Sequence, residues 1–235
     1  MNLTTICTGN QPWIMHLERW FRYARLNFPQ AKLHLIYAGD PRLTTEGVIS
    51  EFDEVKMYGP EVICRPWFNE VRMDATEIFG VDEILYIDCD CDIHEPLDGI
   101  MGDSELELGY CRSPVCHPQW TVLSDDMGYG RASWSANNGL LYMRRSFKAE
   151  YAEARAKIEE MQKGSRIGGI LVFNLMLKMY PLIALEINYL YSVIRSDCSQ
   201  IKGEPVLKLA KTIQYCNKFN QEHRLQLEQN WRNAL

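Results

Sequence analysis

Three aspartates stand at every second position directly after an apolar run. Asp88, Asp90 and Asp92 follow Ile84–Ile87. Alternate side chains of an extended chain point to the same side, so we expect the three carboxylates to share one face. Carboxylates this close repel one another unless a cation lies between them, and oxygen ligands suit Mg²⁺, Mn²⁺ or Ca²⁺. The pattern therefore predicts a divalent metal site after a buried strand, with a solvated acidic turn as the alternative.

Two other uses of paired aspartates fit the sequence poorly. A calcium-binding loop between two helices needs glycine at its sixth position and glutamate at its twelfth. Counted from Asp88, these positions hold Ile93 and Gly99. Phosphatases with an aspartate nucleophile usually carry the motif on the first strand of the fold, whereas several predicted elements precede it here. Asp125 and Asp126 would have to serve as their later metal pair.

Composition and charge narrow the class of protein. The chain has 235 residues, of which 46% are hydrophobic and 24% charged, and this is the composition of a globular protein. Its net charge of −6 disfavours a dedicated nucleic-acid binder. We expect no transmembrane segment and no signal peptide, because the apolar runs are short and the first residues are not basic. The 8 cysteines lack the spacing of a disulfide framework, so we expect reduced thiols and a cytoplasmic location.

Strand and helix patterns alternate along the first half of the chain. Apolar residues at helical spacing predict helices from about Pro12 and from Pro66 to Phe79, and short apolar runs predict strands between them. This alternation is typical of a mostly parallel central sheet with flanking helices, an α/β fold. The aspartates would then follow a central strand, where such sheets bind ligands. The predicted strands are Leu3–Cys7, Lys32–Ala38 and Ile84–Ile87.

The second half is less regular. Arg112–Ala136 shows no periodicity, and we expect a long functional loop there. Its aromatic residues Trp120, Tyr129 and Trp134 would either form a platform for a ligand or anchor the loop to the core. After the loop we expect strands at Gly139–Tyr142 and Ala184–Ile187 and helices at Ser146–Gln162 and Ile167–Met179. An extended segment at Val206–Tyr215 and a polar terminal helix would follow. No repeat or linker interrupts the chain, so we predict one domain over residues 1–235.

Two short motifs resemble a known family. Leu85-Tyr86-Ile87-Asp88-Cys89-Asp90 is similar to the Leu-Tyr-Leu-Asp-x-Asp of A-type-fold glycosyltransferases, in particular the glycogenin and bacterial galactosyltransferase group, glycosyltransferase family eight. Asn137-Asn138-Gly139, with the apolar residues after it, is similar to the Asn-x-Gly segment of that group. The likeness covers roughly Asn2 to Arg145 in the order of elements. It implies the A-type (GT-A) fold, with residues 1–100 as the nucleotide- and metal-binding half and residues 101–235 as the sugar and acceptor half.

The resemblance also implies roles for individual residues. Asp90 would bind Mn²⁺ or Mg²⁺, and Asp88 would serve both the metal and the donor ribose. The turn Thr8-Gly9-Asn10 and Arg72 would hold the nucleotide of a nucleotide-diphosphate sugar, with a UDP-sugar expected. Asn137, Asn138 and Gly139 would lie near the donor sugar.

The sequence departs from the family at two places. The family takes a third metal ligand from a late His-x-x-Gly-x-x-Lys-Pro-Trp segment, and here Gln214 stands where its histidine would be. Gln214 would ligate through its amide oxygen, His223 would substitute, or the ion would be held by aspartates, diphosphate and water, with Asp92 as a further carboxylate. The family also has an Asp-Gln pair at the start of a later helix, where this chain has Gly168-Gly169-Ile170. No catalytic residue can therefore be assigned.

We interpret the sequence as a glycosyltransferase that moves a hexosyl or pentosyl group from a nucleotide-diphosphate donor. A metal-dependent nucleotidyltransferase is the first alternative, although Thr8-Gly9-Asn10 lacks its Gly-rich loop and basic residue. A non-catalytic nucleotide-sugar-binding protein is the second. The acceptor is unknown. A saccharide, protein or small molecule is favoured, and the acidic charge disfavours a modified nucleic-acid base.

Overall fold

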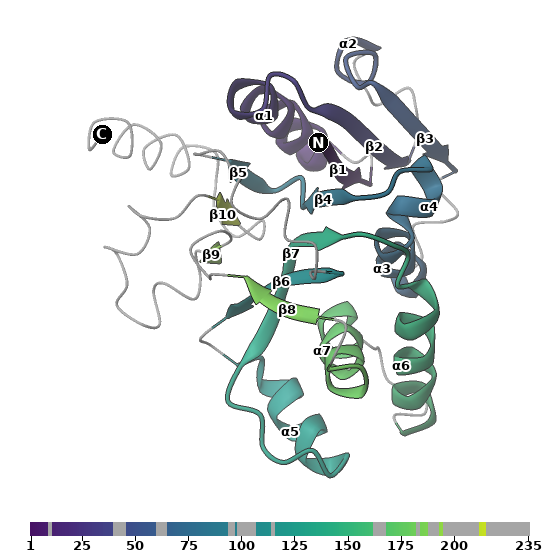
Figure 1. The fold of residues 1–235 in the computed structure, drawn as a ribbon, viewed down its shortest axis with the longest axis vertical. Coiled ribbons are helices and arrows are strands. Elements are labelled where there is room, and N and C mark those ends of the chain that lie inside the picture. Colours follow the sequence, from purple (N-terminus) through teal and green to yellow (C-terminus); the bar gives the residue numbers. More distant parts are fainter. Residues whose placement is uncertain are drawn as a thin grey trace, which may run out of the picture.

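The fold is built on one seven-stranded mixed sheet in the strand order β3-β2-β1-β4-β7-β6-β8 (Figure 1). The structure is a computed structural model, and it describes residues 1–8, 11–39, 46–59, 65–93, 97, 107–113, 116–161, 168–181, 184–187, 193–194 and 212–214. The strands are β1 (Asn2–Cys7), β2 (Lys32–Ala38), β3 (Glu54–Tyr58), β4 (Ile84–Ile87), β6 (Leu108–Ser113), β7 (Ser135–Met143) and β8 (Ala184–Ile187).

Most neighbouring strands of this sheet run parallel. β1 to β4 form a parallel set, β6 and β8 are parallel, and β7 is antiparallel to both β4 and β6. The expected α/β fold with a mostly parallel central sheet is confirmed, and β4, which leads into the aspartates, is its middle strand. One sheet thus contains strands from both predicted halves of the chain. The division at residue 100 stays a prediction.

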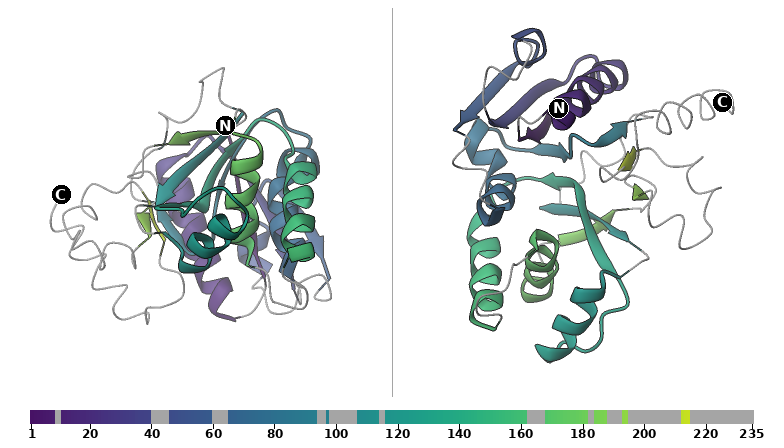
Figure 2. Two further views of the ribbon diagram at one scale, coloured as in Figure 1. Left: turned by 90° about the horizontal axis from the view of Figure 1, so that it is seen from below. Right: turned by 180° about the vertical axis from the view of Figure 1, so that it is seen from behind.

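Helices cover both faces of the sheet (Figure 2). Helix α1 packs on one face through Leu17, Trp20 and Ala24, and α3, α6 and α7 pack on the other. The apolar side chains of β4 alternate accordingly, with Ile84 and Tyr86 on the α3 side and Leu85 and Ile87 on the α1 side. The helices are α1 (Gln11–Asn27), α2 (Glu46–Ile49), α3 (Arg65–Met73), α4 (Ala75–Phe79), α5 (Pro118–Asp126), α6 (Lys148–Met161) and α7 (Gly169–Met179).

Two sequence expectations are wrong in detail. The single helix expected from Pro66 to Phe79 is two helices, because the chain turns at Asp74, whose backbone at φ −102° and ψ 5° is not helical. The long loop expected at 112–136 contains helix α5, which begins at Pro118 and buries Trp120 and Leu123. Helix α5 was missed because its apolar stripe is too short to show a helical period. The proline at its start is nevertheless typical of the first position of a helix. No helix among the described residues is long and apolar enough to span a membrane.

Trp120 belongs to the core. Its side chain is only 1% exposed, so it anchors α5 and takes no part in a surface platform. Trp134 is half-buried beneath two cations, with the guanidinium of Arg112 at 5.0 Å and the ammonium of Lys178 at 5.7 Å from the ring centroid. Tyr129 is 43% exposed. Of the three aromatic residues, these two remain within reach of a ligand.

A small second sheet joins the C-terminal region to the turn after β4. Strands β5 (Cys91–Ile93), β10 (Thr212–Gln214) and β9 (Val193–Ile194) form it in the order β5-β10-β9. β10 runs antiparallel to β5, and the pairing places Ile213 opposite Asp92 and Gln214 opposite Cys91. A segment more than 100 residues from the aspartates in sequence is thereby brought beside them.

The first prediction concerns the start of β7. The side chain of Asn174 on α7 accepts a hydrogen bond at 2.8 Å from the backbone N–H of Ala136, and Asn174 is 1% exposed. Asn174→Leu leaves this N–H buried without a partner, so we expect the free energy of unfolding to fall by about 1–3 kcal/mol. Urea denaturation measures it. Val122→Ala, at a 62% exposed position, is the control and should change it by less than about 0.5 kcal/mol. Equal effects of the two substitutions would contradict this role of Asn174.

Candidate functional site

The carboxylate of Asp88 is fixed where β4 ends. Its Oδ1 accepts a hydrogen bond from the hydroxyl of Tyr86 and lies 3.0 Å from Nη2 of Arg72. Tyr86 and Asp88 are two residues apart, so an extended strand places both side chains on the α3 side of the sheet. The Asp88 side chain is 17% exposed, whereas that of Arg72 is 6% exposed. The carboxylate is therefore held from the protein side and remains accessible at the surface.

Arg72 joins three elements at this point. Its Nη1 donates a hydrogen bond of 2.8 Å to the carbonyl oxygen of Asn138, and its guanidinium lies 4.7 Å from the centroid of the Tyr86 ring. Burial lowers the pKa of Arg72, but the surrounding groups, above all the negative charge of Asp88, outweigh it and raise the pKa above its ordinary value. The guanidinium is thus charged and binds α3 to β4 and β7. The role of Arg72 at the nucleotide, which the resemblance implies, stays a prediction.

The three aspartates do not share one face, contrary to expectation. The chain turns at Cys89 and Asp90, and the N–H of Cys91 donates a hydrogen bond of 3.0 Å to the carbonyl of Asp88. Asp90 lies in the turn and is 4% exposed. Because the turn interrupts the extended chain, Asp92 points to α1, where its Oδ2 lies 2.7 Å from Nη2 of Arg19. Asp92 is fully buried and serves this ion pair, so the structure separates it from Asp88.

The predicted sugar-binding segment is attached to the same turn. The N–H of Asp88 donates to the carbonyl of Gly139 at 2.8 Å, and the N–H of Gly139 donates to the side chain of Asn137 at 2.9 Å. Asn137 is 2% exposed, and Asn138 is half-buried. Residues 138–140 have no partner on β6, because Tyr110 pairs with Leu141 while Cys111 pairs with Asn137. Bulges of this kind are common beside active sites, and this one directs the segment to the aspartate turn.

The cysteines beside the aspartates are unsuitable as metal ligands. The hydrogen bond between Cys89 and Cys7, together with burial and the nearby charges of Asp90 and Asp88, raises the pKa of the Cys89 thiol well above its ordinary value. A thiol must lose its proton to bind a metal. Cys91 is fully buried, and its sulfur lies 3.9 Å from the carbonyl oxygen of Gly139. The side chains that this turn offers to an ion are therefore carboxylates, which favour a hard cation.

Several predicted site residues can be placed only in part. Thr8 follows β1 and is half-buried, while Gly9 and Asn10 lie outside the described residues. The backbone of Gln214 lies opposite Cys91, beside the aspartate turn, as a third ligand would require. Its ligation stays a prediction, and His223 lies outside the description.

Asp88 and Asp90 alone do not complete a metal site. The described part of the chain contains no group of three or more His, Cys, Asp or Glu side chains able to hold an ion. Two carboxylates in one turn nevertheless fit Mg²⁺ or Mn²⁺, which are commonly bound by one or two carboxylates together with phosphate oxygens of a substrate. The residues present therefore fit an ion that shares its coordination with a diphosphate.

Sequence reasoning missed three features of the site. The Tyr86 hydroxyl could have been found, because tyrosine two residues before an aspartate shares its face on a strand. The pairing of Arg72 with Asp88 and the carbonyl of Asn138, and that of Arg19 with Asp92, join residues 16 to 73 positions apart. No local sequence pattern predicts contacts between residues so far apart in the chain.

Comparison with solved structures identifies the fold. The galactosyltransferase LgtC, in complex with donor and acceptor sugar analogues, is similar with a TM-score of 0.66 and 12% identity, over 99% of this chain and 94% of that chain. An active-site mutant of LgtC gives a TM-score of 0.64 and 14% identity over 100% of both chains. Mouse xyloside xylosyltransferase 1 in its apo form gives 0.60 and 11% identity, over 94% of this chain and 100% of that chain. The chain therefore has the expected A-type glycosyltransferase fold. No protein-family model and no curated protein sequence matches it.

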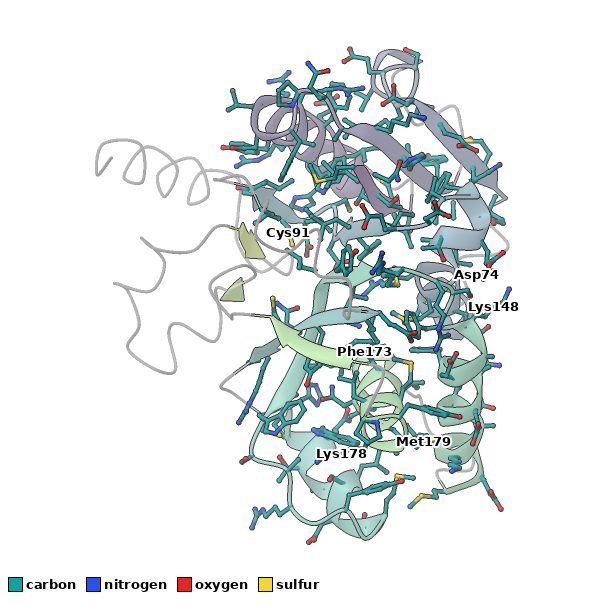
Figure 3. The ribbon with its side chains drawn as sticks, in the orientation of Figure 1. Asp74, Cys91, Lys148, Phe173, Lys178 and Met179 are labelled. Atoms are coloured by element: carbon teal, nitrogen blue, oxygen red, sulfur yellow. The ribbon has the colours of Figure 1, made fainter. Side chains whose placement is uncertain are left out.

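The second prediction concerns the Arg72–Asp88 ion pair. Arg72→Met leaves the Asp88 carboxylate without its counter-charge, so we expect the free energy of unfolding in urea to fall by about 3 kcal/mol. Lys148→Met is the control, because Lys148 is 54% exposed and its pair with Asp74 lies at the surface, away from Cys91 (Figure 3). That substitution should cost at most about 1 kcal/mol.

The double variant Arg72→Met with Asp88→Asn separates charge from packing. If the unpaired carboxylate causes the loss, removing its charge restores part of the stability. Strictly additive losses would instead show that Arg72 stabilises the protein by packing alone.

Proposed function

We propose that this protein transfers a sugar from a nucleotide-diphosphate donor to an acceptor, with Asp88 and Asp90 holding a divalent metal ion. The observation that carries the proposal is the aspartate turn itself. It follows the middle strand of the sheet, its first carboxylate is oriented by Arg72 and Tyr86, and its backbone is bonded to the Asn137–Gly139 segment. The similar fold of LgtC, a galactosyltransferase, supports the same conclusion.

The donor nucleotide would bind next to this turn. Thr8 directly follows β1, which is the parallel neighbour of β4, so a nucleotide at 8–10 would reach the aspartates with its diphosphate. A UDP-sugar carrying a hexose or pentose is the donor that we propose. Mn²⁺ or Mg²⁺, when bound, would neutralise the charge that grows on the departing diphosphate. Gln214, opposite Cys91, is our candidate for a further ligand.

The protein around Asp88 holds its carboxylate in one orientation before a ligand binds. The orientation of a side chain that is already hydrogen-bonded costs no further entropy when the ligand binds, and a fixed charge needs no rearrangement during the reaction. Arg72 and Tyr86 restrict Asp88 in this way, and Asn138 presents its half-buried side chain from the adjoining segment. The acceptor would enter from the solvent side of this edge. We propose a saccharide, protein or small molecule, in the cytoplasm as the scattered cysteines predict.

The third prediction tests the donor. We expect one class among UDP-, GDP-, ADP-, CDP- and TDP-sugars, UDP foremost, to raise the melting temperature only when Mn²⁺ is present. At a ligand concentration of about 100 times Kd the stabilisation is about 2.7 kcal/mol, which corresponds to roughly 5–10 °C for a chain of this size. Differential scanning fluorimetry measures the shift. Asp90→Ala should abolish it, while Asp125→Ala, which removes an exposed carboxylate on α5, should leave it unchanged.

Other outcomes of the same screen would exclude the proposal. A shift with nucleoside triphosphates but with no nucleotide sugar would identify a nucleotidyltransferase. A nucleotide-sugar shift without release of free sugar from the donor, and without transfer to any acceptor, would indicate a binding protein. No shift with any nucleotide would leave the aspartates as an acidic turn.

A further inference from the structure

The side chain of Asn69 on α3 packs directly against Gly169, the first residue of α7. A Cβ atom at position 169 would lie 2.1 Å from Nδ2, 2.5 Å from Cγ and 2.7 Å from Oδ1 of Asn69. These distances are far shorter than any tolerable contact, so only glycine admits the amide in this position. The neighbouring Gly168 is different, because a Cβ there would meet only Cγ of Leu171, at 4.0 Å.

The backbone of α7 does not itself require glycine at position 169. The residue lies in the first turn of a helix, and its φ is outside the positive range that favours glycine. Glycine also lowers helix stability relative to alanine. The glycine is explained by the space that Asn69 occupies.

Within the described structure, no hydrogen bond of Asn69 explains why Gly169 leaves space for its side chain. Its amide forms no hydrogen bond with any residue that the structure describes, and the first turn of α7 receives no side-chain cap from its N-cap residue Gly168. Asn69 is also half-buried, so solvent or a ligand can reach it. An amide normally brings two N–H donors and an acceptor oxygen into use. A polar group that is fixed in position and has no hydrogen-bond partner among the described residues is a candidate ligand contact.

The position of Asn69 points to the donor sugar. Asn69 stands three residues before Arg72, so both side chains project from the same face of α3. Arg72 contacts Asp88 and the carbonyl of Asn138, and Asn69 lies about one helical turn before Arg72 along α3. The N-cap Gly168 and the first residues of α7, Gly169 and Ile170, bring no polar side chain to this region, and Asn69 supplies one.

We propose that Asn69 binds hydroxyl groups of the donor sugar and that Gly169 keeps its amide in place. The inference rests on the proposed function. Sugar hydroxyls both donate and accept hydrogen bonds, and the amide of asparagine complements both roles. The contact is to the sugar and not to the nucleotide, which binds at the end of β1. Asn69 is thereby a specificity-determining residue on α3.

The experiment compares a nucleotide with and without its sugar. Isothermal titration calorimetry in Mn²⁺ gives the Kd of UDP, UDP-glucose, UDP-galactose and UDP-xylose for the parent and each variant. Asn69→Ala should weaken binding of the UDP-sugar about 3- to 10-fold, the loss expected for one neutral hydrogen bond, and change the Kd of UDP less than about 2-fold. A residue with a purely structural role would affect UDP and the UDP-sugar alike.

Two glycine variants provide the matched test. Gly169→Ala keeps Asn69 but forces its amide away, so it should weaken UDP-sugar binding as Asn69→Ala does. The double variant should bind no more weakly than either single variant, because both remove the same contact. Gly168→Ala adds the same methyl group one residue earlier, where the space is open, and should leave every Kd within about 2-fold of the parent. If Asn69→Ala does not fold, Gly169→Ala carries the test.

The possible failures can be told apart. If the parent binds none of the four probes, the proposed UDP-sugar donor is wrong. If the parent binds a UDP-sugar and Asn69→Ala or Gly169→Ala binds it equally well, the proposed function stands and the role of Asn69 is excluded. A loss of UDP and UDP-sugar affinity in equal measure also overturns the inference.

Discussion

The buried ion pair between Arg72 and Asp88 is the constraint on which the rest of the site depends. The side chain of Arg72 is only 6% exposed, and a charged group with so little access to water is tolerated only with a nearby counter-charge and hydrogen bonds. Asp88, the carbonyl of Asn138 and the face of the Tyr86 ring supply them together. These partners come from β4, β7 and the chain directly after β4, so one side chain of α3 fixes the relative positions of three segments.

The aspartate turn follows from this arrangement. Asp88 is bonded through its backbone N–H to Gly139 and through its side chain to Arg72 and Tyr86, and the chain beyond it must turn to meet β10. Asp90 therefore lies at the bend, while Asp92 is withdrawn to Arg19 on the opposite side of the sheet. The three carboxylates have different partners although their spacing in the sequence is uniform. In the proposed function Asp88 and Asp90 would hold the ion, whereas Asp92 pairs with Arg19 on α1.

Local periodicity explains which parts of the fold the sequence predicted. The strands at Leu3–Cys7, Lys32–Ala38 and Ile84–Ile87 are short apolar runs bounded by turn residues. This local pattern was sufficient to predict them. The shared face of the aspartates was wrong because its argument assumed an extended chain, and the partners that bend the chain come from β7 and β10. Asn69 carries no sequence signal, since its position depends on a glycine 100 residues away. Long-range contacts of this kind determine the geometry of a site, and they produce no periodic pattern in the sequence.

The charge balance of the turn indicates how an ion would bind. Arg72 offsets the negative charge of Asp88, so the two carboxylates of the turn alone would attract a divalent cation only weakly. An amide such as that of Gln214 would add a ligand atom but no charge. A diphosphate beside the turn brings the missing negative charge and further oxygen ligands. In the proposed function, the ion and the nucleotide would therefore strengthen each other's binding, and the metal would be held most tightly while the sugar donor is present.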